Sequence, residues 1–173
     1  SIGNRNPQGI YYDSIKDVIV SVEHGPQGGD EVNININPDH NNVKNYGWPI
    51  SSYGEHYSFN KLELPFLYEL APLKKSHKEF GFTEPIKEFT PSIGVSDLAK
   101  IPSKFNGNLT EQYLLAGMGH LLSEGDLSLH HIQFDENYNS IVEEDIIPIG
   151  ERIRDLVYID AWNKVLLFLE TSG

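Results

Sequence analysis

Short runs rich in valine, isoleucine, tyrosine and phenylalanine recur along the whole chain, and clusters of turn-forming residues separate them. The 15 glycines and 10 prolines would interrupt long helices, but they suit tight turns between strands. Runs of this length and spacing predict an antiparallel all-β fold of the kind that builds sandwiches, barrels and propeller blades. The predicted strands are Ile10 to Tyr12, Asp17 to Glu23, Val32 to Ile36, Ile86 to Phe89, Tyr113 to Ala116, Ser128 to Phe134, Ser140 to Ile147, Ile153 to Ile159 and Val165 to Leu169.

One long segment departs from this pattern, being polar and aromatic rather than strand-like. Pro65 and Pro72 limit any helix within it. In a β scaffold, such an insertion is more often a surface excursion or an active-site wall than a separate domain. We therefore predict one partial domain over residues 1–173 with an excursion at about 55–82. Four leucines fit a short helix there: Leu62, Leu64, Leu67 and Leu70.

Composition excludes several classes of function. A formal net charge of −12 repels polyphosphate, so nucleic acid is not an expected partner. The absence of cysteine excludes disulfides, thiolate metal sites and thiol nucleophiles. No apolar stretch approaches the roughly 20 residues that cross a bilayer, and the polar start lacks a signal-peptide pattern. Because the chain also stops directly after an apolar run, we interpret it as a fragment of a longer protein.

Three blocks carry a more specific signal: Gly3 to Gly9 (GNRNPQG), Glu23 to Asn33 (EHGPQGGDEVN) and Asn45 to Pro49 (NYGWP). In this order and at this spacing they resemble the glucose/sorbosone dehydrogenase family. Each block alone would be a weak signal, whereas all three together are specific. The resemblance covers essentially the whole chain and continues through Thr83 to Ile86, Phe89 to Ser92, Gly150 to Asp155 and Leu169 to Gly173.

The resemblance implies a six-bladed β-propeller, of which this chain would cover about half the blades. In the family, pyrroloquinoline quinone lies on one face of the propeller over a calcium ion, and an aldose is oxidised at C1 to the lactone. The expected cofactors are therefore pyrroloquinoline quinone and calcium, and the expected partners are an aldose and an external electron acceptor. The resemblance also implies export to the periplasm or the cell exterior, where the cofactor is loaded.

Arginine side chains suit the cofactor, because its carboxylates favour guanidinium forks. Arg152 and Arg154 are two residues apart, which on a strand places both side chains on one face. Taken alone, such a pair is more often two solvated arginines, but the matching family block favours cofactor contact. By the same resemblance Arg5 and Asn6 face the quinone, although Asn6 would also suit an Asx turn before Pro7.

The expected calcium ligands come from the resemblance. Gly25 and Pro26 match residues whose backbone carbonyls bind the calcium of the cofactor, although a tight turn alone also explains this pair. A second, structural calcium is implied beside Ser51 to Tyr57, with a carboxylate from Glu84. The pair Asp30-Glu31 either adds negative potential near these sites or forms an ordinary solvated face.

Two further positions are assigned to the cofactor by resemblance. Ser92 falls where the family brings a small hydroxyl side chain close to it. His120 stands where the family usually presents a lysine, and an imidazole would bind a carboxylate or quinone oxygen more weakly and in a pH-dependent way. The alternative is that His120 is only a loop-end histidine.

The catalytic base of the family is a histidine upstream of residue 1, so no catalytic residue is assigned to any of the 7 histidines here. A non-catalytic propeller that serves as a binding or interaction module is the alternative reading. A calcium-dependent lactonase would need a convergent cluster of carboxylate and asparagine ligands, which the sequence does not suggest. A partial propeller leaves strand edges unpaired, so we also expect the isolated fragment to self-associate.

Overall fold

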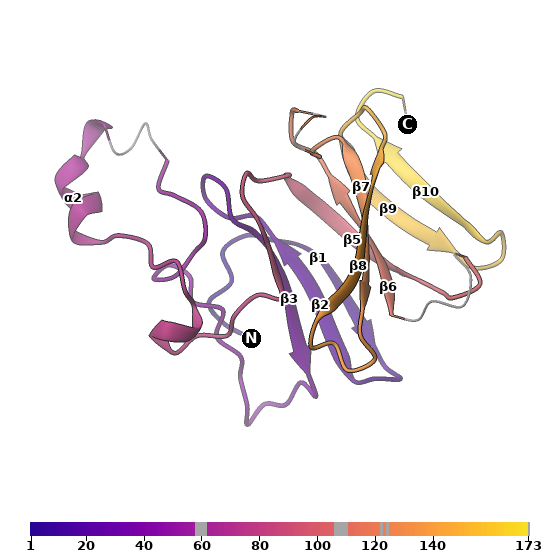
Figure 1. The fold of residues 1–173 in the computed structure, drawn as a ribbon, viewed down its shortest axis with the longest axis horizontal. Helices are drawn as coiled ribbons and strands as arrows, with labels where there is room; N and C mark the ends of the chain where they lie inside the picture. The colour runs from indigo at the N-terminus through magenta and orange to yellow at the C-terminus, as the bar shows by residue number, and fades with distance from the viewer. Residues whose placement is uncertain (58–61, 106–110, 122, 124, 173) are drawn as a thin grey trace.

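The computed structural model describes residues 1–57, 62–105, 111–121, 123 and 125–172. Within these residues, ten strands form three antiparallel sheets that stand one behind another (Figure 1). The predicted all-β class is therefore confirmed. A single long excursion leaves this array and lies to one side of it, at the left of Figure 1.

The first sheet has four strands in the order β1 (Pro7–Asp13), β2 (Val18–Glu23), β3 (Asp30–Ile36) and β4 (Lys87–Phe89). The second sheet repeats that layout with β5 (Val95–Ile101), β6 (Gln112–Gly117), β7 (Ser128–Phe134) and β8 (Ile141–Pro148). The third sheet pairs β9 (Ile153–Ile159) with β10 (Lys164–Leu169). Repeated antiparallel meanders of this kind are propeller blades.

The first strand of each sheet packs against the first strand of the next, because β5 contacts both β1 and β9. The sheets therefore fan out from a shared inner row of strands. One apolar core, with Val20, Leu115 and Ile132, fills the space between the first two sheets. A second core, with Leu114 and Ile153, fills the space between the second sheet and the third. Burial between successive blades is thus the main source of stability.

The excursion occupies residues 37–86, between β3 and β4. The described part of the excursion includes the α-helix α2 (Pro65–Leu70) and a 3-10 turn at Lys78–Phe80. The structure has a short helix in the predicted region, but it includes only Leu67 and Leu70 of the four leucines, because Pro65 is its first residue and Leu62 and Leu64 precede it. The first position of a helix tolerates proline, because its backbone nitrogen needs no intrahelical partner. Phe66 on this helix is 67% exposed.

The sequence failed to predict one strand, β5 (Val95–Ile101). The other nine are confirmed with small changes of bounds. Strand β5 reads VSDLAKI, and its Ser96, Asp97 and Lys100 hide the alternation expected of a strand. Those polar residues are tolerated because each has a partner in a neighbouring element: Ser96 Oγ, for example, donates to the Ile153 carbonyl at 2.6 Å.

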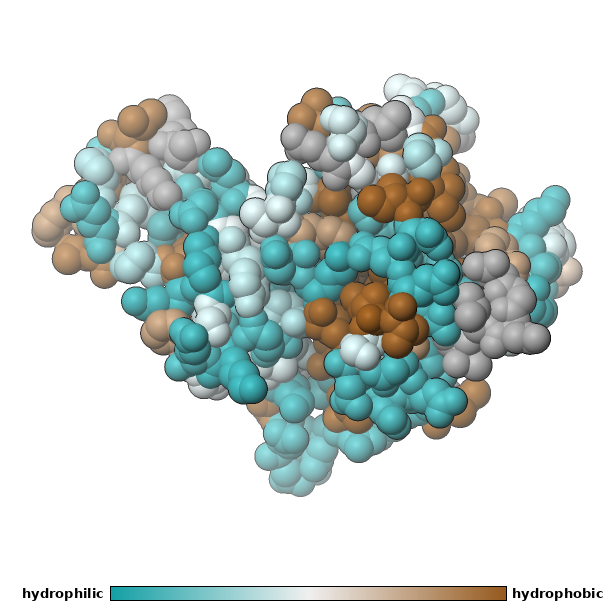
Figure 2. Space-filling view, viewed as in Figure 1, coloured by the Kyte–Doolittle hydropathy of each residue, from teal (hydrophilic) through white to brown (hydrophobic). Residues whose placement is uncertain are grey.

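The third sheet leaves an apolar groove against the second sheet. The groove has a volume of about 480 Å³, and Leu114, Leu129, Val165 and Leu167 contribute to its lining. Figure 2 shows apolar surface also where β8 crosses the face turned to the viewer, a strand on which Ile146 is 53% exposed. Among the described residues, no helix has the length and apolar character that crossing a membrane requires.

Candidate functional site

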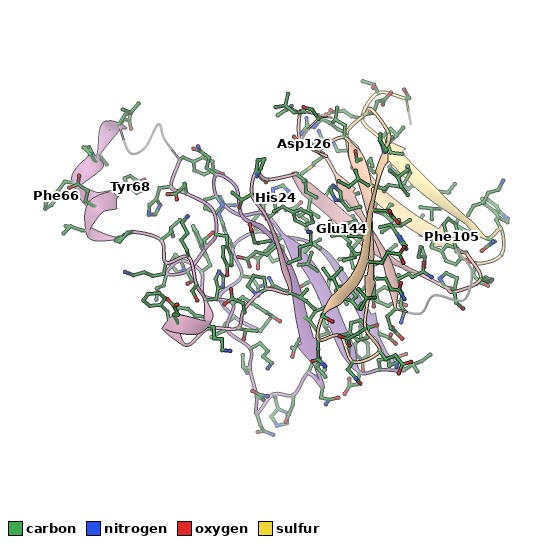
Figure 3. All side chains as sticks on the ribbon, in the orientation of Figure 1. His24, Phe66, Tyr68, Phe105, Asp126 and Glu144 are labelled. Atoms are coloured by element: carbon green, nitrogen blue, oxygen red, sulfur yellow. The ribbon has the colours of Figure 1, made fainter. Side chains whose placement is uncertain are left out.

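The loops that carry the sequence-predicted cofactor residues meet at one end of the sheets, called here the upper end. It is the end at which β1, β5 and β9 begin and β2 and β6 finish. His24 and Asp126, labelled in Figure 3, mark it in the first and second sheets. The structure therefore gathers at one end the residues that the sequence places far apart: Arg5, Asn6, Gly25, Pro26, Ser92, His120, Arg152 and Arg154.

Arg5 lies at this end on an aromatic wall. Its Nη1 donates to the His24 carbonyl at 3.1 Å, and its Nη2 donates to the Tyr57 hydroxyl at 3.2 Å. The guanidinium carbon lies 5.3 Å from the centroid of the Trp48 ring. The Nε atom is buried without a hydrogen-bond partner. A buried donor without an acceptor is costly, so this arginine has capacity for a further anionic oxygen.

Asn6 and Ser92 flank that position. Asn6 is exposed, and its Oδ1 accepts a hydrogen bond from Gln8 Nε2 at 3.1 Å. Ser92 is half-buried in the loop before β5, where its Oγ accepts the Gly94 N–H at 3.4 Å. Both polar groups therefore remain near the surface of the upper end.

The turn that holds Gly25 and Pro26 is fixed by a buried carboxylate. Asp30 Oδ1 accepts the Gly25 N–H at 3.1 Å, and Asp30 Oδ2 accepts the Val95 N–H of β5 at 3.0 Å. A Cβ atom on Gly25 would lie 2.1 Å from the Gly28 carbonyl oxygen, so only glycine fits. The interpretation of Asp30-Glu31 as a solvated face is wrong, since these side chains are 0% and 6% exposed.

Hydrogen bonds connect the first two sheets directly at the upper end. His24 Nε2 donates to the Val95 carbonyl at 2.5 Å. Met118 N–H donates to the Gly94 carbonyl at 2.8 Å, which draws the loop after β6 towards β5. His120, further along that loop, is exposed, and its backbone N–H is held by Asp126 Oδ2 at 2.7 Å. The loop is thus fixed while the imidazole stays accessible.

Arg152 and Arg154 converge on a single carboxylate, that of Glu170. Arg152 Nη1 donates to Glu170 Oε1 at 3.2 Å, and Arg154 Nη2 donates to the same oxygen. Arg152 Nε also donates to the Met118 carbonyl at 2.6 Å. The hydrogen bond from Arg154 is the main reason that the pKa of Glu170 is lowered. The two guanidinium groups therefore already form an anion-binding fork.

Sequence reasoning missed Glu170 and Met118 as parts of this arrangement. The signal for Glu170 is its position one residue after β10, because Leu169 pairs with Ile153, between the two arginines. An acidic residue at that register faces them across the sheet. No sequence signal identifies Met118, which acts mainly through its backbone carbonyl.

Glu84 belongs to a different group in the excursion. The Tyr53 hydroxyl donates to Glu84 Oε1, and the Lys78 N–H donates to Oε2 at 2.8 Å. Burial, followed by the hydrogen bond to Glu84, raises the pKa of Tyr53. Across the described ranges, no group of three or more histidine, cysteine, aspartate or glutamate side chains is arranged to hold a metal ion.

A buried acidic cluster lies beneath Arg5. Glu23 and Glu31 line a cavity of about 10 Å³, which suffices for one water molecule. Burial, together with the negative charge of Glu23, raises the pKa of Glu31 to about 8. His77 Nε2 lies 3.3 Å from Glu31 Oε1, and burial lowers the pKa of this histidine. At neutral pH we therefore expect Glu31 to carry a proton and His77 to be neutral.

Comparison with known proteins identifies the family to which the sequence is similar. The sequence profile described as Glucose / Sorbosone dehydrogenase matches residues 1–169. The chain is 33% identical to the aldose sugar dehydrogenase YliI of Escherichia coli over 160 residues, which is 90% of this chain and 37% of that protein. The chain therefore spans little more than a third of the length of this relative.

Solved structures give the same picture of the fold. The soluble aldose sugar dehydrogenase of Escherichia coli in its apo form matches with a TM-score of 0.72 at 24% identity, over 98% of this chain and 43% of that one. The aldose sugar dehydrogenase of Streptomyces coelicolor in its PQQ-bound form matches with a TM-score of 0.54 at 21% identity, over 89% and 34%. At these identities the likeness establishes the fold, a part of a β-propeller.

Proposed function

Because the chain belongs to the glucose/sorbosone dehydrogenase family, we propose that it is the cofactor-binding part of a quinoprotein that oxidises an aldose at C1 to the lactone. Its cofactors in this proposal are pyrroloquinoline quinone and calcium. An external acceptor takes the electrons, and the protein acts in the periplasm or outside the cell. Residues 1–173 form one partial propeller domain in it.

One observation carries this proposal: Arg152 and Arg154 both bind the carboxylate of Glu170 at the upper end. The expected cofactor is a planar tricarboxylate, so it presents the same chemical group as Glu170 does. The side chains of Arg152 and Arg154 are 30% and 44% exposed, so a ligand can reach them. The guanidinium groups of Arg152 and Arg154 therefore fit the quinone. In this proposal, a carboxylate of the quinone displaces the Glu170 carboxylate or binds beside it.

The other upper-end residues would hold and orient the bound group. Arg5 offers its guanidinium group on an aromatic wall, while Asn6 and Ser92 offer accessible polar groups. The backbone carbonyls of Gly25 and Pro26 are the proposed calcium ligands. The buried Asp30 holds that turn in place from below.

When bound, the quinone accepts a hydride from the sugar and calcium polarises its oxygens. The residues of this chain bind and orient, whereas the base that takes the anomeric proton is expected outside it. His120 occupies the position of the usual lysine, and its exposed imidazole would strengthen the hold on a carboxylate only when protonated.

A non-catalytic propeller remains the second candidate, and two observations favour it. His120 replaces the lysine that the family presents, and Glu170 already binds both arginines of the pair. In that case Glu170 would keep Arg152 and Arg154 occupied, so that the upper end would not bind the quinone. The propeller would then serve as a scaffold for binding another partner.

The test is a calcium-dependent titration of the full-length parent protein with pyrroloquinoline quinone, followed by dye-linked oxidation of a panel of aldoses. Arg152→Ala and Arg154→Ala should each weaken quinone binding by about 10- to 100-fold, since each removes a charge-assisted contact. Lys104→Ala, which removes an exposed cation in the loop after β5, is the matched control and should bind normally. Absence of quinone binding by the intact parent would favour the non-catalytic propeller.

A further inference from the structure

The excursion contains a second cation centre, formed around Lys75. Lys75 Nζ donates to the Tyr53 carbonyl at 3.0 Å and to the Gly54 carbonyl at 2.6 Å. The same ammonium lies 2.7 Å from Glu55 Oε1. Three consecutive residues of one loop thus turn an oxygen atom towards a single positive charge.

Backbone carbonyls and carboxylates are the oxygen ligands that calcium prefers in proteins. An ammonium group satisfies the same ligands with its three N–H donors. The contact distances, from 2.6 to 3.0 Å, are in the range of charge-assisted hydrogen bonds and reach beyond the 2.3–2.6 Å of calcium–oxygen bonds. The loop therefore has the ligand chemistry of a cation site, and a lysine side chain supplies the cation.

The residues that the family resemblance assigns to a structural calcium do not fit that ion. Two carbonyls of the Ser51 to Tyr57 loop, those of Tyr53 and Gly54, accept hydrogen bonds from Lys75. Both oxygens of Glu84 are already bound, by Tyr53 and by the Lys78 N–H. The described part of the chain also lacks a cluster of three side chains suited to a metal. The expected second calcium site at Glu84 therefore disagrees with the arrangement of these side chains.

We propose that the ammonium of Lys75 replaces this structural calcium, so that the loop keeps its shape without a metal ion. The replacement matters for the upper end. Gln27 and Glu55 exchange two backbone hydrogen bonds, at 3.0 and 2.8 Å, which join the loop to the Gly25–Pro26 turn. Lys75 thereby acts as a positioning residue for that turn. The proposal concerns the quinone-free protein, so it holds or fails separately from the proposed dehydrogenase function.

The test compares Lys75→Gln with Lys74→Gln in the full-length, quinone-free parent protein. Lys74 is the matched control, because its ammonium lies over the Phe80 ring, 5.2 Å from the centroid, and contacts none of the three oxygens. Thermal unfolding is measured in EDTA and in millimolar calcium. Lys75→Gln should lower Tm by about 2–4 °C in EDTA, and calcium should restore it, because the freed oxygens become a metal site.

Terbium luminescence gives a second readout that does not depend on stability. Tyr53 lies within the loop, so a terbium ion bound there would be sensitised by its ring. Emission should appear in Lys75→Gln and stay at the wild-type level in Lys74→Gln. Equal emission from wild type and Lys75→Gln would overturn the proposal. So would a larger EDTA effect on wild type than on Lys75→Gln, or a loss of stability in Lys75→Gln that calcium does not reverse.

Discussion

The two ends of the sheets both carry cations bound to carboxylates, but they differ in burial. At the opposite end, called here the lower end, β1 and β5 finish. There Lys100 Nζ is bound by Asp13 and lies 2.6 Å from Glu111 Oε2. These two carboxylate side chains are only 4% and 8% exposed. At the upper end, Arg154 and Glu170 are 44% and 36% exposed.

The difference separates structural charge from charge that is available to a ligand. At the lower end Tyr138 completes the network by donating to Asp13 at 3.0 Å, and no ligand could replace these partners without unfolding the sheet edge. Burial opposes the charge on Lys100, but the carboxylates of Asp13 and Glu111 raise its pKa overall. The upper-end arginines can exchange Glu170 for another carboxylate, because all three side chains reach solvent.

The largest expected effect comes from breaking the lower end. Lys100→Met should destabilise the parent protein by about 3 kcal/mol, because it leaves the buried Asp13 without its cation and leaves Glu111 with only Lys16, 3.8 Å away. Urea unfolding at pH 7 measures this. Lys104→Met is the control, since its ion pair with Asp160 is 51% and 79% exposed. It should cost much less than Lys100→Met, because solvent screens an exposed ion pair. Equal losses of unfolding free energy in the two variants would show that the buried and the exposed ion pairs contribute alike to stability.

A pH experiment tests whether the contribution of a charged group to stability depends on its burial or on the end of the sheets at which it lies. Glu31 lies at the upper end but is buried, with a folded pKa of about 8 against an unfolded value of 4.5. The folded state therefore holds a proton that the unfolded state has released, so stability falls as pH rises towards 8. The depressed pKa of His77 has the opposite effect, but only as pH falls through the unfolded value of 6.5.

Between pH 6.5 and 8 the Glu31 effect stands alone, and unfolding free energy should drop by about 2 kcal/mol. Glu31→Gln should flatten that slope, because the amide cannot ionise. Urea unfolding of both proteins across this range gives the measurement. A slope that survives unchanged in Glu31→Gln would mean that another group causes it.

A smaller effect is expected at the upper end when the carboxylate, rather than an arginine, is removed. Glu170→Gln removes the carboxylate that competes for Arg152 and Arg154. Quinone affinity of the parent should rise about fivefold. The titration is the one described for the arginine variants. Unchanged or weaker binding would show that Glu170 orients the arginines rather than competing with the ligand.

The smallest expected effect concerns stability at the open end. Arg154→Gln should change unfolding free energy by only about 0.5 kcal/mol, because its ion pair is half-exposed. Urea unfolding alongside Lys100→Met provides the contrast. A loss as large as that of Lys100→Met would place Arg154 in the structural network instead.

Most of the fold could be predicted because nine strands show plain apolar runs between turns. Strand β5 could not, since Asp97 and Lys100 find partners in other sheets, namely the Leu156 N–H of β9 and the Asp13 carboxylate of β1. Asp97 Oδ2, for instance, accepts the Leu156 N–H of β9 at 3.3 Å. Side chains whose partners lie far along the chain leave no local signal.

The site shows the same limit. The family blocks identified Arg5, Arg152 and Arg154, and the structure brings their loops to one end, although their cofactor roles stay predictions. The blocks gave no indication of Glu170 as a competitor. Lys75 lies outside every block, so its place at the Tyr53 and Gly54 carbonyls could not be inferred from spacing. Such contacts depend on how the excursion folds back, which periodicity does not encode.

The excursion between β3 and β4 also affects the order of folding. Strand β4 pairs with β3 (Asp30–Ile36), but residues 37–86 separate the two strands in the chain. The first sheet is therefore complete only after this long segment has folded back. The second sheet needs only short connections between its strands, so its contacts close at lower entropic cost. We expect pulse-labelling hydrogen exchange during refolding to protect β6 and β7 before β4, and simultaneous protection would contradict this. The blade that comes second in the chain would then be the template on which the first is completed.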